Sequence, residues 1–282
     1  AIKRSPYPGW FFTPAAIIYS VLFLVPTFAS LYFSLTRWTL FDSEFIGLEN
    51  FAQFLREPFL IKGLINTVIY AAVTSGLKVV VGLLLAVMLT SQIVGRGYLR
   101  SVIFFPVLVS TVGVGITFTV LMHPTQGMIN ETLALFGIAG PGWLTDPNLA
   151  LYSVALVDVW KGVGLATVIY IAGLVAIPQD YYEAARIDGA TPWQQFQRIT
   201  LPLLVPAIAN TYLLAFVESL ADFGNPLVLG GNFEVLSTKI FFAIVGAQHE
   251  PGRAAVLAMV LLAFTLAAVF GLRIEDIFDP KG

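Results

Sequence analysis

Six apolar stretches, each long enough to cross a lipid bilayer as a helix, dominate this chain. A bilayer core about 30 Å thick needs about 20 apolar residues in a helix, because backbone amides in hydrocarbon must be hydrogen-bonded within their own segment. The stretches are Phe11–Phe33, Leu64–Leu89, Ser101–Met122, Leu151–Ile177, Leu203–Leu220 and Ala254–Leu272. The sequence therefore predicts an all-α membrane protein with about six transmembrane helices, organised as a single domain over residues 1–282.

The composition agrees with a membrane protein. Only 11% of the 282 residues are charged, against roughly a quarter in soluble domains. The net charge of −2 gives no reason to expect a nucleic acid partner, and the absence of cysteine removes disulfides and thiolate chemistry. Pro206 lies near the start of the fifth stretch, which we expect to be the span that bends or breaks. Val235–Val245 is apolar but too short to span, and we expect it to be re-entrant or interfacial.

Lysine and arginine indicate the orientation, because cytoplasmic loops retain them. If the N-terminus is cytoplasmic, eight lie on the cytoplasmic side and five outside. The cytoplasmic residues are Lys3, Arg4, Arg96, Arg100, Arg186, Arg198, Arg273 and Lys281, and the outer residues are Arg37, Arg56, Lys62, Lys239 and Arg253. We therefore expect both termini, the Ser91–Arg100 loop and the Pro178–Pro202 loop to face the cytoplasm.

The loop over residues 178–202 is amphipathic, unlike the segments on either side. Pro178 suits a helix start, with Asp180 in the first turn, and Gly189 supplies a break. Thr191 and Pro192 are typical of a second helix start, and we expect Pro202 to end the exposed part. The pattern predicts two short helices with an apolar surface that includes Tyr182, Ala185, Ile187, Trp193 and Phe196.

The spacing within this loop is that of a known motif. Glu183-Ala184-Ala185, then Gly189, then Ile199 and Leu201-Pro202 resemble the EAA loop of permease subunits in binding-protein-dependent ABC importers. Further similarity to the sugar-importer branch, of the maltose and glycerol-phosphate permease type, lies at Gly47–Phe51, Asn66-Thr67, Trp160, Ala172-Gly173-Leu174 and Ile177-Pro178. The alternative for the loop alone is an amphipathic helix lying on the membrane surface.

The resemblance implies a type I importer permease fold in a bacterial or archaeal inner membrane. It implies that the loop docks as a coupling helix on a cytoplasmic ATPase subunit, through Glu183, Ala184, Ala185, Asp188, Gly189, Ile199, Leu201 and Pro202. The implied partners are a second permease subunit in a heterodimer, two ATPase subunits and an extracytoplasmic solute-binding protein. No G-x-x-x-x-G-K-[ST] phosphate loop is present, so we expect this chain to be non-catalytic and to bind no cofactor, with ATP and Mg²⁺ on the partner subunits.

Ionisable residues within membrane spans are costly and indicate function by default. Asp158 and Lys161 are three residues apart and can neutralise each other on one helix face, as a structural pair or in a pathway. Lys78 has no acidic residue nearby in the sequence, so it requires a partner on another helix or a hydrated cavity, and a role in packing is favoured over contact with the solute.

Polar residues gather on and just after the fifth stretch. Glu218 and Asp222 are one helical turn apart; they either face a cavity for a cation or sugar hydroxyls or mark the helix leaving the bilayer. The candidate substrate pathway is Asn210, Tyr212, Glu218, Asp222 and Asn225. His123 and His249, the latter beside Glu250, are too few and too poorly spaced for a metal site, and we predict none.

The C-terminal part carries a second resemblance. Residues 218–226 and Val235–Thr238 are similar to permeases for ferric iron or polyamines, and Gly230–Phe233 departs from the sugar branch. The expected function is ATP-driven import of a sugar or oligosaccharide, with ferric iron or polyamine as the alternative cargo. An ion-gradient transporter using Lys78 and Asp158 is a further alternative, but the two halves show no repeat. The acidic tail Arg273–Gly282 has no physical explanation.

Overall fold

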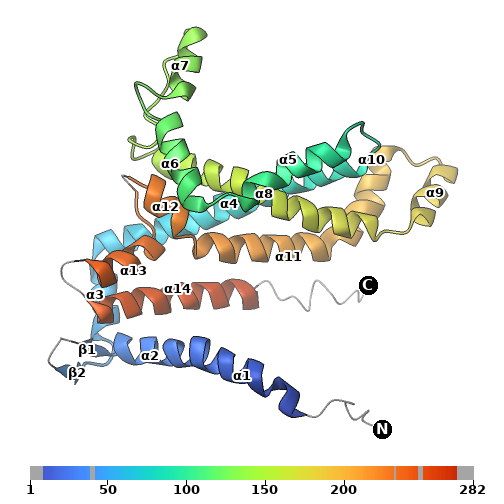
Figure 1. Ribbon diagram of the computed structural model, residues 1–282. Coiled ribbons are helices and arrows are strands. Elements are labelled where there is room, and N and C mark those ends of the chain that lie inside the picture. The colour runs from blue at the N-terminus through green and yellow to red at the C-terminus, as the bar shows by residue number, and fades with distance from the viewer. Residues whose placement is uncertain (1–8, 39–41, 232, 247–249, 272–282) are drawn as a thin grey trace. The chain divides into compact units, whose positions relative to one another are not determined.

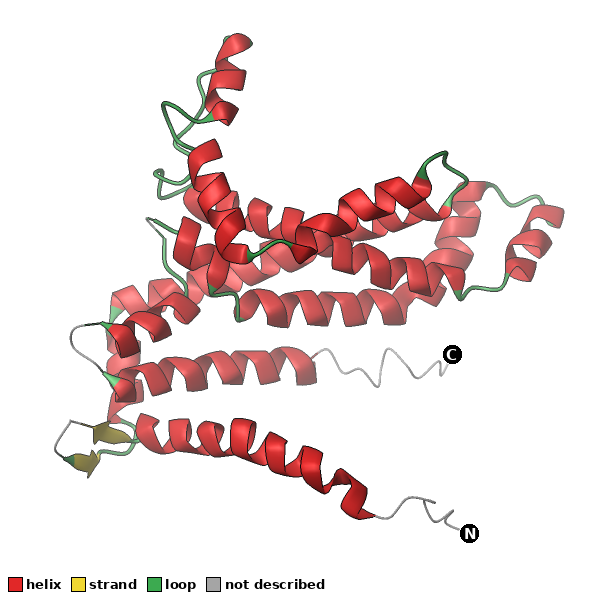
Figure 2. Cartoon of the chain, in the orientation of Figure 1, coloured by secondary structure: helices red, strands yellow, loops and turns green. Residues whose placement is uncertain are grey.

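The computed structural model is helical, with one short β-hairpin (Figures 1 and 2). It describes residues 9–38, 42–231, 233–246 and 250–271. The elements are α1 (Thr13–Tyr19), α2 (Val25–Ser34), β1 (Thr36–Trp38), β2 (Ser43–Phe45), α3 (Glu49–Arg56), α4 (Pro58–Thr90), α5 (Arg96–Leu108), α6 (Thr111–Leu121), α7 (Met128–Leu135), α8 (Ala150–Val175), α9 (Gln179–Ile187), α10 (Pro192–Gln195), α11 (Leu201–Leu220), α12 (Gly224–Leu229), α13 (Leu236–Val245) and α14 (Pro251–Gly271). Short turns, η1 (Gly9–Phe12), η2 (Ser20–Leu24) and η3 (Phe196–Thr200), extend or join the helices.

The predicted spans are confirmed as long apolar helices, apart from the third. Within the described residues, five continuous helical segments are long and apolar enough to cross a bilayer. They are Trp10–Ser34, Pro58–Thr90, Ala150–Val175, Pro192–Leu220 and Pro251–Gly271. The third predicted span is the pair α5 and α6, which brings the number to six if the pair counts as one span. The short apolar piece near residue 240 is the helix α13.

The bend lies in the third span and not in the fifth, so the prediction based on Pro206 was wrong. The axes of α5 and α6 differ by 98° at a two-residue break, where Val109 and Ser110 adopt extended backbone angles. Valine and serine are weak helix formers, and serine favours the position just before a helix. Pro206 instead lies inside the continuous helix α11.

One helical run continues through Pro202 from Pro192 to Leu220, so the second helix of the loop joins the fifth span without a break, and the prediction that the exposed part ends at Pro202 stays a prediction. The π turn η3 lies just before this proline. A proline ring clashes with the carbonyl four residues earlier in a regular helix, and here that residue, Arg198, lies within the wider π turn. The same arrangement occurs in the first span, where the π turn η2 contains the residue four positions before Pro26.

The described residues form two compact units, which the chain connects within α4, α13 and α14. One unit comprises Lys62–Thr238 with the segment from Ala263. Its helices α4, α5, α8 and α11 run side by side, and α9 and α10 lie at one end of them (Figure 1). Its main core brings together buried side chains of α4, α6, α8 and α12, including Tyr70, Val114, Val154 and Leu229.

The other unit comprises the chain up to Ile61 with Lys239–Leu262. Strands β1 and β2 pair antiparallel, with Arg37 opposite Glu44. The Nδ2 of Asn50 donates to the carbonyl oxygens of Ser34 at 3.0 Å and Thr36 at 2.9 Å, so α3 is fastened to the end of the first span. The partition into units does not test the prediction of a single domain, which stays a prediction.

Candidate functional site

The helices α9 and α10 form a hairpin whose turn is specified by Gly189. This residue has φ of +77°, a left-handed conformation that costs other residues energy. The amide of Gly189 donates to the carbonyl oxygen of Arg186 at 3.1 Å, and the amide of Ala190 donates to that of Ala185 at 2.8 Å. These two bonds are those of a Schellman motif, which satisfies the last carbonyls of α9. The turn is therefore a defined structure, as the sequence predicted.

The second helix of the hairpin begins with the predicted cap. The Oγ1 of Thr191 accepts from the amide of Gln194 at 3.3 Å, and the Oε1 of Gln194 accepts from the amide of Thr191 at 2.8 Å. This capping box fixes the start of α10 directly after the turn. The hydroxyls of Tyr182 and Thr200 lie 2.8 Å apart, so α9 is also joined to η3. The capping box therefore fixes the start of α10, and the contact between Tyr182 and Thr200 fixes α9 against η3.

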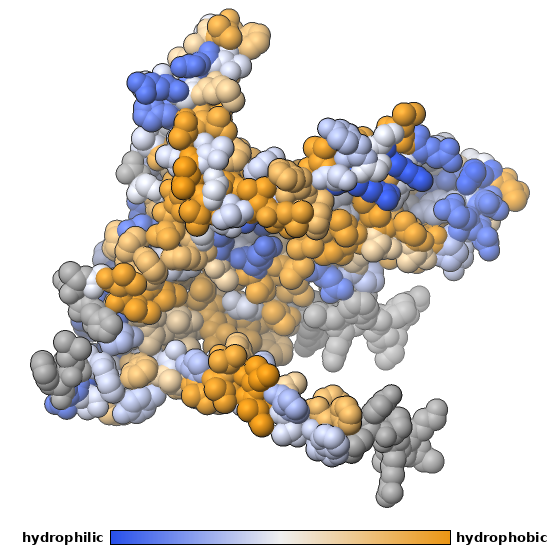
Figure 3. Space-filling model, in the orientation of Figure 1, coloured by the Kyte–Doolittle hydropathy of each residue, from blue (hydrophilic) through white to orange (hydrophobic). Residues whose placement is uncertain are grey.

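The hairpin exposes apolar side chains at the end of its unit. Ile187 is 86% exposed and Trp193 is 64% exposed, and the Trp193 ring stacks on Phe196. The end of the unit that carries α9 is largely hydrophilic, whereas the flanks of the long helices in this unit are mainly hydrophobic (Figure 3). The residues that the resemblance assigns to coupling lie along this segment: Glu183, Ala184 and Ala185 on α9, Asp188 and Gly189 in the turn, Ile199 in η3, and Leu201 and Pro202 at the start of α11.

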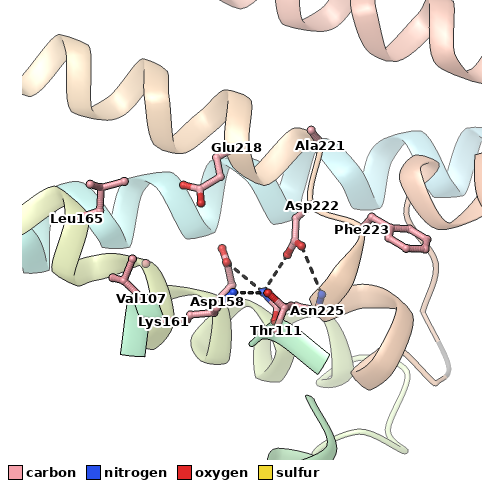
Figure 4. A pocket seen from close by; sticks show the side chains of 11 residues that line it. Val107, Thr111, Asp158, Lys161, Leu165, Glu218, Ala221, Asp222, Phe223 and Asn225 are labelled. Atoms are coloured by element: carbon pink, nitrogen blue, oxygen red, sulfur yellow. Dashed lines mark hydrogen bonds between the residues drawn. The ribbon is translucent and has the colours of Figure 1, made fainter. Parts of the chain in front are cut away.

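A second feature is a pocket of about 390 Å³ in the same unit (Figure 4). This volume lies in the range of small-molecule sites, roughly 300–1,000 Å³. Its polar lining residues are Thr111, Asp158, Lys161, Glu218, Asp222 and Asn225, from α6, α8, α11, α12 and the α11–α12 connection. Apolar side chains, including Val107, Leu165 and Phe223, complete the wall.

A buried ion pair lies behind the pocket. The Nζ of Lys78, 2% exposed, is 2.9 Å from the Oδ2 of Asp158 and 3.9 Å from Glu218. The expectation that Lys78 needs a partner on another helix is therefore confirmed, with Asp158 on α8 as that partner. Gly162 makes this approach possible, because a Cβ there would lie 2.5 Å from the Cε of Lys78.

The predicted pair of Asp158 and Lys161 was wrong. No ion pair joins them in the described chain, and Lys161 donates to the Oγ1 of Thr111 on α6. Residues three apart on a helix share a face, but here each side chain finds its partner on a different neighbouring helix. Asp158 also accepts from the Nδ2 of Asn225 at 3.2 Å.

Asp222 connects three elements. Its Oδ2 accepts from the hydroxyl of Tyr70 on α4 at 2.7 Å and from the Nδ2 of Asn225 at 3.0 Å. Its Oδ1 accepts from the amides of Gly224 at 3.1 Å and Asn225 at 3.4 Å, at the start of α12. Sequence reasoning missed the role of Tyr70, which is separated from Asp222 by more than half of the chain and carries no charge to mark it.

The pocket brings together part of the predicted substrate pathway. Glu218, Asp222 and Asn225 line it, whereas Asn210 and Tyr212 do not. Asn210 is exposed on α11, and Tyr212 stacks on Phe216 one turn along the same helix. The assignment of these five residues to a pathway stays a prediction.

Within the part of the chain that the structure describes, one of the two histidines, His123, can be placed. The Nδ1 of His123 accepts from the amide of Gln126 at 3.2 Å, within the turn that follows α6. Across residues 9–38, 42–231, 233–246 and 250–271, no three potential metal ligands gather. His249, Asn232 and the acidic tail Arg273–Gly282 lie outside the described residues.

Comparison with known proteins identifies the family of this chain. The family described as "binding-protein-dependent transport system inner membrane component" matches residues 78–281. The chain is 31% identical to the probable ABC transporter permease protein YurN of Bacillus subtilis (strain 168), over 94% of each chain. It is 33% identical to the trehalose/maltose transport system permease protein MalF of Thermococcus litoralis, over 77% of this chain and 75% of MalF.

A crystal structure of a bacterial ABC transporter involved in the import of the acidic polysaccharide alginate superposes with a TM-score of 0.78 at 25% identity, covering 93% of each chain. The chain belongs to the family of inner membrane permease components of binding-protein-dependent ABC transport systems.

Proposed function

We propose that this permease forms half of the translocation pathway of an ATP-driven importer. We also propose that its α9–α10 hairpin docks on an ATPase subunit, whose conformational change moves the permease helices. The observation that carries the proposal is the construction of the hairpin. Its turn and second helix are fixed by the Schellman motif and the capping box, while Ile187 and Trp193 remain exposed. A rigid element with an apolar surface is suited to a cleft on another protein, because burial of that surface stabilises docking.

ATP and Mg²⁺ belong to partner subunits in this proposal. The 282 residues contain no phosphate loop, so the energy comes from two cytoplasmic ATPase subunits on which the hairpins of two permease subunits dock. We infer a heterodimer of permeases, and an extracytoplasmic binding protein that delivers the solute. The chain itself is then non-catalytic and binds no cofactor.

The orientation follows the distribution of positive charge. Counted along the sequence from a cytoplasmic N-terminus, eight lysine and arginine residues fall in cytoplasmic segments and five in outer segments, which supports a cytoplasmic hairpin and cytoplasmic termini. An ATPase docked on the hairpin requires the same orientation. The two arguments are independent and agree.

The proposed cargo is a sugar or oligosaccharide, and the pocket is its contact site. The trehalose/maltose permease is named for such solutes, and the chain matches it over most of its length. Carboxylate, amide and ammonium groups line the pocket beside apolar walls, which suits a solute with many hydroxyls. The names of these relatives give no support to ferric iron or polyamine as cargo.

The test is ATPase activity of the co-expressed complex in vesicles, with and without sugar-loaded binding protein. Glu183→Lys and Gly189→Pro are compared with Glu131→Lys, which makes the same charge change on exposed α7. We expect stimulation to disappear in the two hairpin variants and to persist in the control, while all complexes co-purify intact. Stimulation that survives both hairpin substitutions would contradict the proposal.

A further inference from the structure

The three carboxylates of the pocket differ in how far neighbouring cations and hydrogen-bond donors neutralise them. The carboxylate of Asp158 has a full set of such partners. Asp158 is 7% exposed and pairs with Lys78 at 2.9 Å. It also accepts from the Nδ2 of Asn225 at 3.2 Å and lies 3.5 Å from the Oγ of Ser219. A buried carboxylate with its own cation and further donors has little left to offer a solute. Asp158 therefore serves the helix packing.

The second carboxylate is also occupied. Asp222 accepts four hydrogen bonds, two from the backbone at the start of α12 and two from Tyr70 and Asn225. A carboxylate with four acceptor sites is saturated by this number of donors. Asp222 holds α4, α11 and α12 together.

Glu218 differs from both. Its side chain is 56% exposed, and its contact with a cation in the described chain is a 3.9 Å approach to Lys78, which already holds Asp158. Lys161, the other lining cation, donates to Thr111 and forms no ion pair with Glu218 in the described residues. Glu218 thus presents a largely uncompensated negative charge to the pocket (Figure 4).

A buried acceptor beside these carboxylates also lacks a partner. Asn225 is 2% exposed, and both carboxylates that it contacts bind its Nδ2. Its Oδ1 has no hydrogen-bond donor among the described residues. This atom is closed to solvent, so a solute in the pocket does not reach it, and Glu218 is the carboxylate in the pocket that a solute can contact.

We propose that Glu218 selects a solute with a positively charged hydrogen-bond donor, such as the protonated amine of an amino sugar. The inference rests on the proposed function, in which this pocket contacts the sugar. Three lining carboxylates, Asp158, Glu218 and Asp222, oppose one lining ammonium and the buried Lys78, so a carboxylate on the sugar meets net repulsion. The pocket accepts amino sugars, tolerates neutral sugars and disfavours uronates.

The experiment compares three β-1,4-linked disaccharides that share one skeleton: the glucosamine dimer, cellobiose, and the glucuronate-containing analogue. Binding of each labelled sugar to the complete four-subunit complex in nanodiscs is measured without the binding protein, so that the selectivity of that partner does not enter. We expect the glucosamine dimer to bind about tenfold more tightly than cellobiose, since hydrogen bonds to charged groups contribute at least this factor. The uronate should bind most weakly.

Two variants assign the selectivity to Glu218. In Glu218→Gln the advantage of the glucosamine dimer should disappear while cellobiose binding stays within about twofold, and in Glu218→Lys the uronate should become the preferred sugar. Glu131→Gln, the same change on exposed α7, should leave all three affinities unchanged. Glu218→Gln keeps the shape of a side chain that is more than half exposed, whereas Glu218→Lys places a second ammonium near the buried Lys78, so co-purification of the intact complex is checked for both variants.

The outcomes separate the two proposals. Equal binding of the glucosamine dimer and cellobiose in the unmodified complex, or an amine preference that persists in Glu218→Gln, overturns the charge selectivity and leaves a sugar cargo standing. Binding of none of the three sugars also overturns the charge selectivity, whereas the proposed function is overturned by ATPase stimulation that survives both hairpin substitutions.

Discussion

The ion pair between Lys78 and Asp158 should be energetically coupled, and a double-mutant cycle measures this directly. The single variants are Lys78→Met and Asp158→Asn, and the double variant carries both. Lys78 is 2% exposed and Asp158 7%, so neither charge can recover its solvation from water when its partner is removed.

The structure gives the magnitude. Removing one member of a buried ion pair costs about 3–5 kcal/mol, because the other charge stays buried without compensation. Asp158 keeps Asn225 at 3.2 Å, and Lys78 keeps Glu218 at 3.9 Å, so we expect each single substitution to cost about 3 kcal/mol, at the lower end of the range. The double variant buries neither charge and should lower the free energy of unfolding by about 2 kcal/mol. The two single variants together lower it by about 6 kcal/mol, so the coupling energy is roughly 4 kcal/mol.

The assay is unfolding of the purified complex by dodecyl sulfate in mixed micelles, followed by circular dichroism. Lys62→Met, on the exposed side of the same helix, is the control and should change the free energy of unfolding by less than about 0.5 kcal/mol. Single substitutions whose effects add within about 0.5 kcal/mol in the double variant would refute the reasoning, since independent sites behave in that way.

Three further predictions concern the hairpin. Gly189→Ala places a side chain at φ of +77° and should destabilise the turn by about 1–2 kcal/mol, seen as faster amide hydrogen exchange at Ala190; unchanged exchange would contradict the Schellman assignment. Thr191→Ala removes the cap of α10 and should cost about 1 kcal/mol, measured as faster proteolysis between α9 and α10, whereas an unaltered rate would show that the cap is unimportant. Tyr182→Phe removes the hydrogen bond to Thr200 and should weaken α9 by about 1 kcal/mol in hydrogen exchange; Tyr181→Phe, at an exposed position, should have no effect.

The spans and the hairpin could be predicted from the sequence because their signals are local. A run of about 20 apolar residues satisfies its own backbone, and Gly189 and Thr191 act on neighbouring residues. The bend could not be placed in this way. Pro206 and Pro106 give the same local signal, but both lie inside helices, and the chain turns at Val109 and Ser110.

The pocket was predicted only in part because its partners are distant in sequence. Spacing on α8 suggested that Asp158 pairs with Lys161, and nothing local revealed that Lys78 reaches Asp158 through the space that Gly162 leaves open. Tyr70 is a similar case, since a neutral hydroxyl gives no sign in the sequence that it will bond to Asp222. Side-chain partners across helices depend on the packing of the whole unit, which no single segment encodes.

The 29-residue helical run from Pro192 to Leu220 begins in the hairpin and contains Glu218 near its other end. At 1.5 Å per residue this run is about 43 Å long, and a regular helix is stiff along its axis because each turn is hydrogen-bonded to the next. In the proposed mechanism a displacement of Trp193 is passed along this run toward Glu218, and the π turn Phe196–Thr200 and Pro206 are the places along the run where part of the displacement can be absorbed. If the hairpin docks on an ATPase as proposed, the stiffness of these two places determines how far a movement of the hairpin displaces Glu218.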